Sequence, residues 1–164
     1  MFNAPLSTHN PHVKGCPLRL TNFSNFALRL LQFAALHAPN LIRTEDVARA
    51  HGISRHHLLK AVNTLEKEGF IKAIRGRNGG ITLNRPAKGI TVGEVIRITE
   101  APLELVECFN AQTNTCPLIG VCHLSASIQT ATRAFLAVLD DVTIADIAAN
   151  RSVLLSRLND AETQ

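Results

Sequence analysis

The sequence contains no tryptophan or tyrosine, and only 4% of its 164 residues are aromatic. A core made from this chain must therefore rely on leucine, isoleucine, valine and alanine, within the 46% of residues that are hydrophobic. No apolar run approaches the roughly 18 residues that a membrane-spanning helix needs. The first residues also lack the apolar segment of a signal peptide. These absences predict a protein without a membrane segment that acts in the reducing cytoplasm.

Residue patterns on which enzymes depend are also missing. The chain shows no Ser-His-Asp or Cys-His arrangement, no dinucleotide-binding glycine motif and no paired acidic site. We therefore expect a protein that is not an enzyme. Its formal net charge of +4 at pH 7 is compatible with a polyanionic partner such as nucleic acid.

Residues 1–17 are expected to be a disordered leader, or an extension that starts too far upstream. They contain three prolines and show no hydrophobic periodicity. Cys16 lies in this segment, and we interpret it as a free thiol without a function. Regular structure is expected to begin near Leu20.

Hydrophobic residues recur at helical spacing from position 21 to position 37, which predicts a first helix that ends at Ala38-Pro39-Asn40. Thr44 is expected to cap a short second helix. A third helix should follow Ser54 as its cap and end before Gly69, because glycine readily adopts the left-handed conformation that closes helices. The glycine-containing turn between the second and third helices predicts a helix-turn-helix.

The third helix has two faces of different chemistry. The apolar face, expected inside, consists of Leu58, Val62 and Leu65. The opposite face consists of His56, Lys60, Asn63 and Lys67, and every charge on it is positive. In a helix-turn-helix, residues at the start of the second helix reach base edges in the major groove. The residues expected to contact DNA from this helix are Ser54, Arg55, His56, His57 and Lys60, and His57 is expected to face partly inward.

Two short β-branched runs, residues 70–75 and 80–84, flank Gly76-Arg77-Asn78-Gly79 and predict a β-hairpin. A helix-turn-helix followed by a basic hairpin is a winged helix. Glycines allow close approach to a phosphate, and arginines favour the negative potential of a narrow minor groove. The residues expected to contact DNA from the hairpin are Arg75, Arg77, Asn78 and Gly79. A phosphate-binding enzyme loop is the competing interpretation, and the missing Lys-Ser/Thr pair argues against it.

Further helices are expected in the second half of the chain. A short one should span about residues 92–100 and a long one about residues 123–139. The long helix carries apolar residues at alternating steps of four and three, which suits packing against another helix: Leu124, Ile128, Ala131, Phe135 and Val138. We expect this seam to form a homodimer, although an intramolecular contact would also cover it. Residues 143–146 match a capping box that should open a last helix toward Leu158.

Three of the four cysteines lie within 15 residues on the loop between those helices: Cys108, Cys116 and Cys122. In a reducing compartment, clustered cysteines bind metals or catalyse more often than they form disulfides. Structural zinc sites usually use tighter Cys-x-x-Cys pairs. The wider gaps suit an iron–sulfur cluster, which needs thiolates from several directions. A thiol switch without metal is the alternative.

These segments together resemble the iron–sulfur winged-helix regulators, a family that includes the cluster-biogenesis regulator IscR and the nitric-oxide-sensing repressor NsrR. The resemblance runs from about Leu18 to Leu158 and is carried by LRLTNFSNFALRLLQFAAL, by RGRNGGITLNRPAKGITVGEVI and by the cysteine loop. The stretches most similar to the NsrR subgroup are LTNFSNFALR, LELVECF and LDDVTIADI. We therefore expect a mainly α fold, with a winged-helix DNA-binding domain at 18–90 and the cysteine loop and dimerisation helices at 91–164.

The resemblance implies a homodimeric transcriptional repressor that binds double-stranded operator DNA and carries an iron–sulfur cluster on Cys108, Cys116 and Cys122. A 4Fe-4S cluster is expected, with a 2Fe-2S form as the alternative. It also implies that nitric oxide attacks the cluster and releases the protein from DNA, so that genes for nitric-oxide detoxification are controlled. A response to cluster supply or redox state, as in IscR, is the alternative signal.

One position departs from the pattern of this family. NsrR-like proteins usually carry an aspartate in the first helix that reaches the cluster of the partner subunit as a fourth ligand, and the matching residue here is Asn25. A neutral amide oxygen is a poorer iron ligand than a carboxylate. The fourth position is therefore open to Asn25, to water or a small thiol, or to another side chain such as His123, Glu104 or Glu107.

Overall fold

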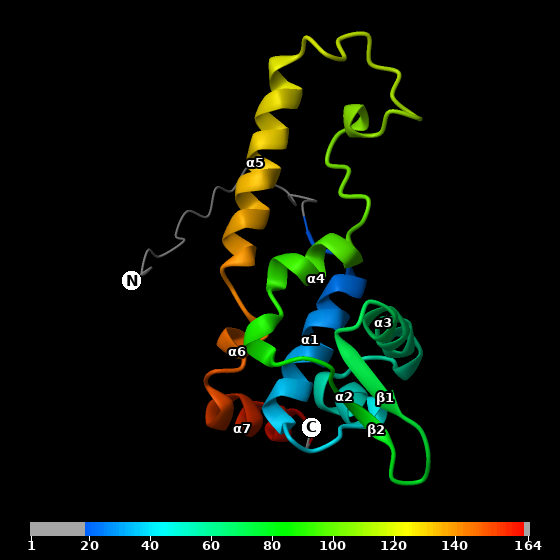
Figure 1. The fold of residues 1–164 in the computed structure, drawn as a ribbon, viewed down its shortest axis with the longest axis vertical. Coiled ribbons are helices and arrows are strands. Elements are labelled where there is room, and N and C mark those ends of the chain that lie inside the picture. Colours follow the sequence, from blue (N-terminus) through cyan, green and yellow to red (C-terminus); the bar gives the residue numbers. More distant parts are fainter. Residues whose placement is uncertain (1–18, 163–164) are drawn as a thin grey trace.

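The computed structural model describes residues 19–162, so the predicted leader and Cys16 lie outside the described residues (Figure 1). The helices are α1 (Asn22–His37), α2 (Thr44–His51), α3 (Arg55–Lys67), α4 (Val92–Thr99), α5 (His123–Asp140), α6 (Ile144–Ile147) and α7 (Arg151–Glu162). The strands are β1 (Ile71–Ile74) and β2 (Gly80–Leu83), and two short 3-10 turns are η1 (Ala87–Gly89) and η2 (Glu107–Phe109). The predicted mainly α winged-helix fold is confirmed. Among the described helices, none is long and apolar enough to cross a membrane.

The central helix α1 begins and ends as the sequence predicts. The hydroxyl of Thr21 accepts a hydrogen bond from the backbone N–H of Ser24, which caps the helix start. The helix ends at His37, just before Ala38 and Pro39. Its buried face packs against α3, α4 and α6, so α1 connects the helix-turn-helix to the C-terminal half of the chain.

The starts of α2 and α3 differ from the prediction. Thr44 is the first residue of α2 and not its cap, because the carbonyl oxygen of Arg43 accepts the first hydrogen bonds of the helix, and the Thr44 side chain is buried. The acidic Glu45 and Asp46 occupy that first turn instead, where their charges favour the helix N-terminus. Ser54 holds the cap position of α3, but its side chain makes no capping hydrogen bond.

Gly69 closes α3 as expected. Its φ of +74° is left-handed, and its N–H donates to the carbonyl oxygen of Glu66 at 3.0 Å. The next N–H, that of Phe70, donates to Leu65 at 2.9 Å. This pair of hydrogen bonds terminates the helix and directs Phe70 into the core, where it is fully buried.

The predicted hairpin is present, with strands one residue shorter at three of their ends. Ile71 pairs with Leu83, and Ile74 pairs with Gly80, in an antiparallel register. A third segment joins the sheet, because Ile42 exchanges two backbone hydrogen bonds with Ile81. The wing is therefore attached to the body through the α1–α2 connection.

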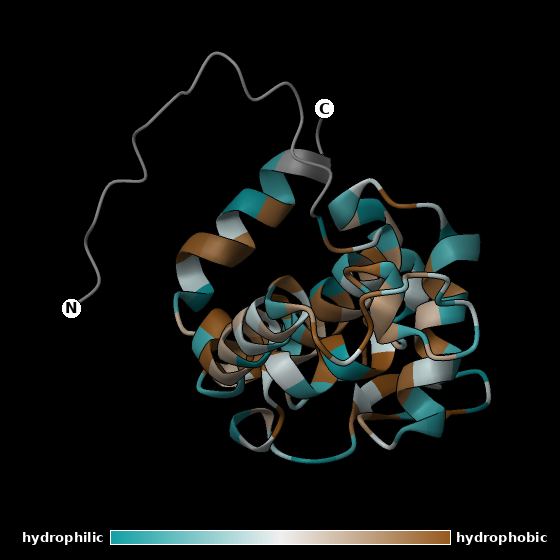
Figure 2. Cartoon of the chain, turned by 90° about the horizontal axis from the view of Figure 1, so that it is seen from above, coloured by the Kyte–Doolittle hydropathy of each residue, from teal (hydrophilic) through white to brown (hydrophobic). Residues whose placement is uncertain are grey.

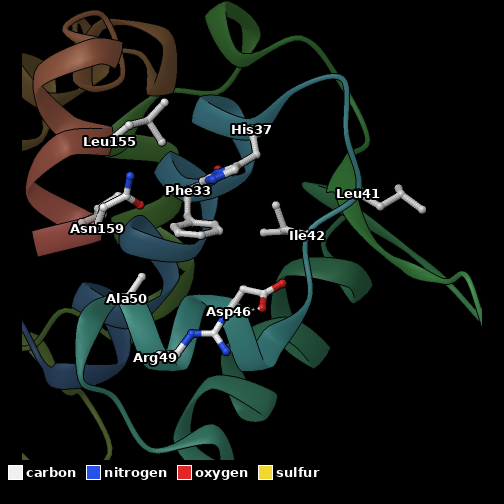
Figure 3. Close-up of a pocket in the computed structure, with 10 residues that line it drawn as sticks. Phe33, His37, Leu41, Ile42, Asp46, Arg49, Ala50, Leu155 and Asn159 are labelled. Carbon is white, nitrogen blue, oxygen red and sulfur yellow. Dashed lines mark hydrogen bonds and ion pairs between the residues drawn. The ribbon is translucent and has the colours of Figure 1, made fainter. Parts of the chain in front are cut away.

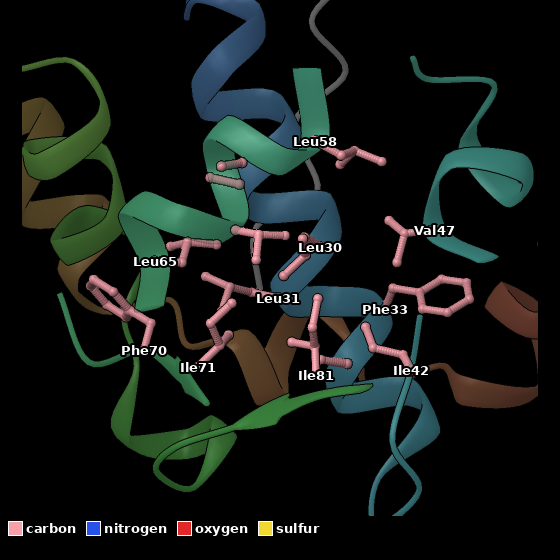
Figure 4. Packing of buried hydrophobic residues seen from close by; sticks show 14 of the residues in the cluster. Leu30, Leu31, Phe33, Ile42, Val47, Leu58, Leu65, Phe70, Ile71 and Ile81 are labelled. Carbon is pink, nitrogen blue, oxygen red and sulfur yellow. The ribbon is translucent and has the colours of Figure 1, made fainter. Parts of the chain in front are cut away.

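One apolar core holds the described chain together (Figure 4). Leu30 and Leu31 of α1 pack with Leu58 and Leu65 of α3, and all four are fully buried. Each such side chain contributes about 1.5–3 kcal/mol by leaving water. The same core includes Val95 and Ile144, so a boundary at residue 90 does not separate two cores. Seen from above, hydrophobic residues gather where the helices face one another (Figure 2).

The expected single last helix is wrong, because two helices occupy that region. The capping box of Thr143 and Asp146 opens α6, which has only four residues. Gln32 of α1 donates to the carbonyl oxygen of Ile147 at 2.6 Å and holds α6 against α1. The chain then turns, and α7 packs against α2. Figure 3 shows Leu155 and Asn159 of α7 facing Phe33 and His37 across a pocket of about 200 Å³.

Helix α5 stands away from the body beside the loop that rises from α4 (Figure 1). Its base is joined to α4, where Gly93 lies so close to Asp140 that a side chain would overlap it. Arg97 and Asp140 form an ion pair at the same junction, with Nη2 and Oδ2 2.6 Å apart. None of the residues of α5 is buried. The seam predicted on this helix is exposed in the single chain, with Leu124 at 65%, Phe135 at 47% and Val138 at 65%.

Candidate nucleic-acid interface and cysteine loop

The outer face of α3 has the chemistry that the sequence predicted. His56, Lys60, Asn63 and Lys67 are all exposed. Leu58, Val62 and Leu65 on the other side are buried, with at most 6% exposure. The burial of one face fixes the rotation of the helix, so the cationic face must point to solvent.

Arg55, the first residue of α3, is held by a residue on α2. Its Nε lies 2.6 Å from Oε1 of Glu45, and both side chains are more than half exposed. The backbone N–H of Glu45 and the Arg55 guanidinium together hold the pKa of the Glu45 carboxyl below its usual value. The predicted base-reading arginine therefore has an ionised partner in the adjacent helix.

Two aromatic rings of α1 contact side chains of α3 that the sequence predicts to reach DNA. The ring of Phe26 stacks on that of His57, with centroids 6.0 Å apart and planes 18° apart. Nζ of Lys60 lies 5.2 Å from the centroid of Phe23. His57 is exposed, and the contact of its ring with Phe26 agrees with the expectation that it faces partly inward. The sequence pattern shows Phe23 and Phe26 only as apolar positions, and nothing in it pairs them with α3.

The tip of the wing presents three exposed polar side chains: Arg75, Arg77 and Asn78. Within the described part of the chain, no hydrogen bond or ion pair engages these side chains. Gly79 has a different role, because a Cβ there would overlap the carbonyl oxygen of Ile74. Its N–H donates to the oxygen of Gly76 at 3.0 Å. Gly79 is thus required by the turn, whether or not its backbone also approaches DNA.

The cysteine loop, residues 101–122, connects α4 to α5. All three of its cysteines are free thiols and partly exposed. Cys108 lies in η2 and donates a hydrogen bond from Sγ to Oγ of Ser125 at 3.3 Å. Cys122 is the N-cap residue of α5, and the N–H of Cys116 donates to Oδ1 of Asn114 at 3.0 Å.

Two of the alternative ligand candidates have partners inside this loop. Oε1 of Glu107 accepts hydrogen bonds from both the N–H and the hydroxyl of Thr115, each at 2.7 Å. The hydroxyl and then the N–H of Thr115 lower the pKa of the Glu107 carboxyl. Oε2 of Glu104 accepts from Asn110 at 3.1 Å. His123, by contrast, is exposed at the first position of α5.

The chemistry of these donors fits an iron–sulfur cluster, since its usual ligands are cysteine thiolates. Their arrangement within one chain is not that of a metal site. Among residues 19–162, no group of three His, Cys, Asp or Glu side chains lies close enough together to hold a metal ion. The structure thus places three available thiols on one loop without bringing them to a common point.

Asn25 lies away from this loop, on α1. It is exposed and lines a hollow of about 430 Å³ between α1 and the start of α3. The other polar residues of the hollow include Arg29, Ser54 and His57, and none of its lining residues is a cysteine. Within a single chain, Asn25 therefore faces the helix-turn-helix.

The base of the cysteine loop is fastened to the start of α1. Oε1 of Glu100, the C-cap residue of α4, accepts hydrogen bonds from the backbone N–H of Thr21 at 2.7 Å and from its hydroxyl at 3.0 Å. The hydroxyl of Ser24 also contacts this oxygen, and its single proton is shared between it and Oγ1 of Thr99, which lies 2.7 Å away. We call Thr21, Ser24, Thr99 and Glu100 the α1–α4 clasp. Sequence reasoning missed it, because its two halves lie far apart in the chain.

Comparison with known proteins agrees with this architecture. A family model described as "Rrf2: Iron-dependent Transcriptional regulator" matches residues 20–150. The HTH-type transcriptional regulator NsrR of Geobacillus kaustophilus is 46% identical over 144 residues, which cover 87% of this chain and 98% of that protein. The NsrR of Bacillus licheniformis is 43% identical over 135 residues, which cover 82% of this chain and 94% of that protein.

Solved structures show the same fold. CymR, described as the global cysteine regulator of B. subtilis, matches with a TM-score of 0.61 and 27% identity over 80% of this chain and 97% of that one. IscR of T. potens matches with a TM-score of 0.66 over 81% of this chain and 88% of that one, and its 22% identity supports the fold alone. Together with the family match, these relatives confirm the resemblance inferred from the sequence. The chain belongs to the Rrf2 family of transcriptional regulators, and it is a DNA-binding repressor and not an enzyme.

Proposed function

We propose that this chain is a homodimeric, cytoplasmic repressor that senses nitric oxide through an iron–sulfur cluster on its cysteine loop. The observation that carries the proposal is that three free thiols lie on a loop whose base is fastened by Glu100 to α1. The same helix α1 supports His57 and Lys60 on the DNA-facing side of α3. Relatives that share 43–46% of their residues with this chain are named NsrR, which supports nitric oxide as the signal.

DNA binding uses two groups of side chains. Ser54, Arg55, His56, His57 and Lys60 enter the major groove from the start of α3, as recognition helices do. Arg75, Arg77 and Asn78 contact the DNA backbone or the minor groove from the wing. Gly79 has no side chain, so its backbone can approach the DNA closely. Cationic contacts to phosphate supply affinity, while contacts to base edges supply specificity.

Cys108, Cys116 and Cys122 hold the cluster, and Asn25 of the partner subunit is the candidate for its fourth position. When bound, an iron–sulfur cluster supplies iron atoms that react with nitric oxide. Hydrogen bonds within the cysteine loop and to α5 determine the conformation of the loop. Cys108 donates a hydrogen bond to Ser125 of α5 at 3.3 Å, and Glu107 accepts one from the N–H of Thr115, the residue before Cys116, at 2.7 Å.

The exposed seam of α5 supports the homodimer. Leu124, Phe135 and Val138 would lose water on pairing with a second copy, which stabilises an interface by about 25 cal/mol per Å² of apolar area. A dimer places two copies of α3 at a defined separation, and operator half-sites lie roughly 34 Å apart per DNA turn. A change at the cysteine loop that is transmitted through the α1–α4 clasp would alter this separation and weaken binding.

Anaerobic spectroscopy combined with DNA binding tests the proposal. The full-length chain, purified without oxygen, should contain iron and sulfide and show visible absorbance that changes on addition of nitric oxide. Affinity for operator DNA should fall in parallel, by about 100-fold if the two states differ by roughly 2.7 kcal/mol. Cys16→Ser is the matched control, since Cys16 lies outside the cysteine loop, and it should behave like the native protein.

The competing candidate is a thiol switch without metal. It is favoured by the observation that the three thiols are free and are not grouped as metal ligands within one described chain. Purified protein that contains no iron or sulfide, and whose DNA affinity responds to oxidants but not to nitric oxide, would establish it. An IscR-like signal is separated in the same experiment, because it predicts a response to loss of the cluster and none specific to nitric oxide.

A further inference from the structure

The recognition helix does not position its first side chain alone. Arg55 begins α3, and Glu45 belongs to α2, the other helix of the helix-turn-helix. Nε of Arg55 and Oε1 of Glu45 lie 2.6 Å apart, which is a short charge-assisted hydrogen bond. The side chains are 58% and 54% exposed, so this contact lies at the surface and not in the core. Exposed ion pairs contribute little to folding, so the main effect of this pair is on the position of the Arg55 side chain.

The contact leaves a particular part of the arginine available. A guanidinium has five N–H donors, one on Nε and two on each Nη. Glu45 engages Nε, and within residues 19–162 no other hydrogen bond or ion pair reaches Arg55. A bidentate contact to DNA can then use only the two Nη groups at the end of the side chain. This end-on pair of donors fits O6 and N7 of guanine, the pair of acceptors that arginine reads in the major groove.

The charge of Glu45 acts on a different part of the DNA. Its carboxyl is ionised near neutral pH, and its own backbone N–H, the Arg55 guanidinium and Arg43 lower its pKa further below the ordinary value. A carboxylate beside Arg55 repels phosphate oxygens, on which sequence-independent binding depends. Hydrogen bonding of the Nη groups to a base edge is less affected, since guanine is neutral. Glu45 therefore penalises the phosphate contact more than the base contact.

We propose that Glu45 is a specificity-determining positioning residue that directs Arg55 end-on toward a guanine in each half-site and away from phosphate. The inference rests on the proposed function only in taking α3 as the DNA-reading helix. Glu45 need not touch DNA, because it acts through Arg55.

The first test compares two kinds of DNA. One is a duplex of about 30 base pairs, roughly three helical turns, selected by the full-length chain from a random pool; the other is an unselected random duplex of the same length. Glu45→Ala should lower the ratio of the two affinities by about tenfold, with tighter binding to unselected DNA. Asp46→Ala is the control: it removes a carboxylate from the same turn, where the partner is Arg49, and should keep the ratio within about twofold.

The second test separates positioning from charge. Each guanine of the selected half-site is replaced in turn by 7-deazaguanine, which lacks the N7 acceptor. The native chain should lose about tenfold in affinity at one position and Glu45→Ala about threefold or less. Glu45→Gln keeps an oxygen that can accept from Nε, so it should retain the tenfold loss while binding unselected DNA more tightly. A purely structural role of Glu45 would not change sensitivity to a single acceptor on the DNA.

The outcomes separate the role of Glu45 from the assignment of α3 to DNA. If Glu45→Ala keeps the native affinity ratio and the native 7-deazaguanine profile while Arg55→Ala loses both, the role of Glu45 is overturned and the α3 assignment stands. If Arg55→Ala leaves affinity for selected DNA unchanged, the α3 assignment itself fails. Arg55→Lys is a further variant, which leaves Glu45 unchanged. Lysine keeps the positive charge but lacks the planar guanidinium, so this variant should lower the ratio of affinities for selected and unselected DNA as Glu45→Ala does.

Discussion

Oε1 of Glu100 accepts hydrogen bonds from the N–H and the hydroxyl of Thr21, two groups that lie 79 positions earlier in the chain. Glu100 is the last residue before the cysteine loop, and Thr21 caps α1. A displacement of the loop can therefore reach α1 through one carboxylate. From α1, the rings of Phe23 and Phe26 extend this connection to Lys60 and His57 on α3.

Glu100→Gln tests this connection. The amide loses the charge and one acceptor site, so the α1–α4 clasp should weaken without unfolding of the core. We expect the change in DNA affinity caused by nitric oxide to shrink by about tenfold, while affinity in its absence changes less. Asp141→Asn is a suitable control, since Asp141 is exposed at the end of α5, away from the clasp. Full retention of the nitric-oxide response in Glu100→Gln would remove the clasp from the mechanism.

Arg77→Ala tests the wing. Arg77 is exposed at the tip of the hairpin, so its removal should leave folding unchanged and delete about one phosphate contact. The slope of log affinity against log salt should then fall by about 0.9. Salt titrations by fluorescence anisotropy measure this slope. An unchanged affinity and slope would contradict the assignment of the wing to DNA.

Gly79→Ala tests the turn of the wing. The new Cβ would overlap the carbonyl oxygen of Ile74, which is backbone and cannot move away cheaply. We expect a loss of about 1–3 kcal/mol in the free energy of unfolding, measured by urea denaturation. Gly89→Ala is the matched control, because a Cβ there meets no atom within 4 Å, and it should be neutral or slightly stabilising. Equal stability of the two variants would show that the close approach at Gly79 relaxes at little cost.

His51 predicts a pH dependence of stability. Its Nε2 is buried without a hydrogen-bond partner, and burial, followed by the charge of Arg29, lowers its pKa to about 4. An unfolded histidine has a pKa of about 6.5. Between these values the unfolded chain binds more protons than the folded one. The contribution of neutral His51 is therefore present above about pH 6.5 and is lost as the pH falls toward 4.

His51→Phe measures that contribution. The shift corresponds to roughly 3 kcal/mol, which screening of the partly exposed ring reduces to about 1–2 kcal/mol. The free energy of unfolding of the native chain should fall more steeply from pH 6.5 to 4 than that of His51→Phe. Comparing the two curves cancels the effect of the carboxylates, which titrate in both. Parallel curves would show that His51 is protonated as easily in the folded state as in the unfolded state.

Local signals in the sequence predicted much of the fold. Gly69 marks the end of α3, and Thr143 and Asp146 mark the start of α6, because these signals act within one helical turn. The break between α6 and α7 could not be predicted in this way. It follows from the hydrogen bond of Gln32 to Ile147 and from the packing of α7 on α2, both of which join distant segments.

In the candidate site, too, the sequence predicted the features that depend on one element and missed those that join two elements. Charge and periodicity identified Lys60 and Arg77 as exposed cations, since each depends only on its own element. The partners that position the recognition helix, Glu45 and Phe26, come from other helices and have no signature in the local pattern. The sequence likewise placed the three cysteines on one loop, but it gave no distances between them, and within the described residues they are not grouped as the ligands of a metal ion.

The most direct test of the account is the operator affinity of the chain in which Cys108, Cys116 and Cys122 are all replaced by serine, measured without oxygen beside the Cys16→Ser chain. Both proteins should show the same circular dichroism spectrum, because none of the three loop cysteines is buried. We expect the triple variant to bind operator DNA about 100-fold more weakly than the native protein, with no further change on addition of nitric oxide. Cys16→Ser should bind with native affinity and lose that affinity when nitric oxide is added. A triple variant that binds operator DNA as tightly as the native protein would contradict the account.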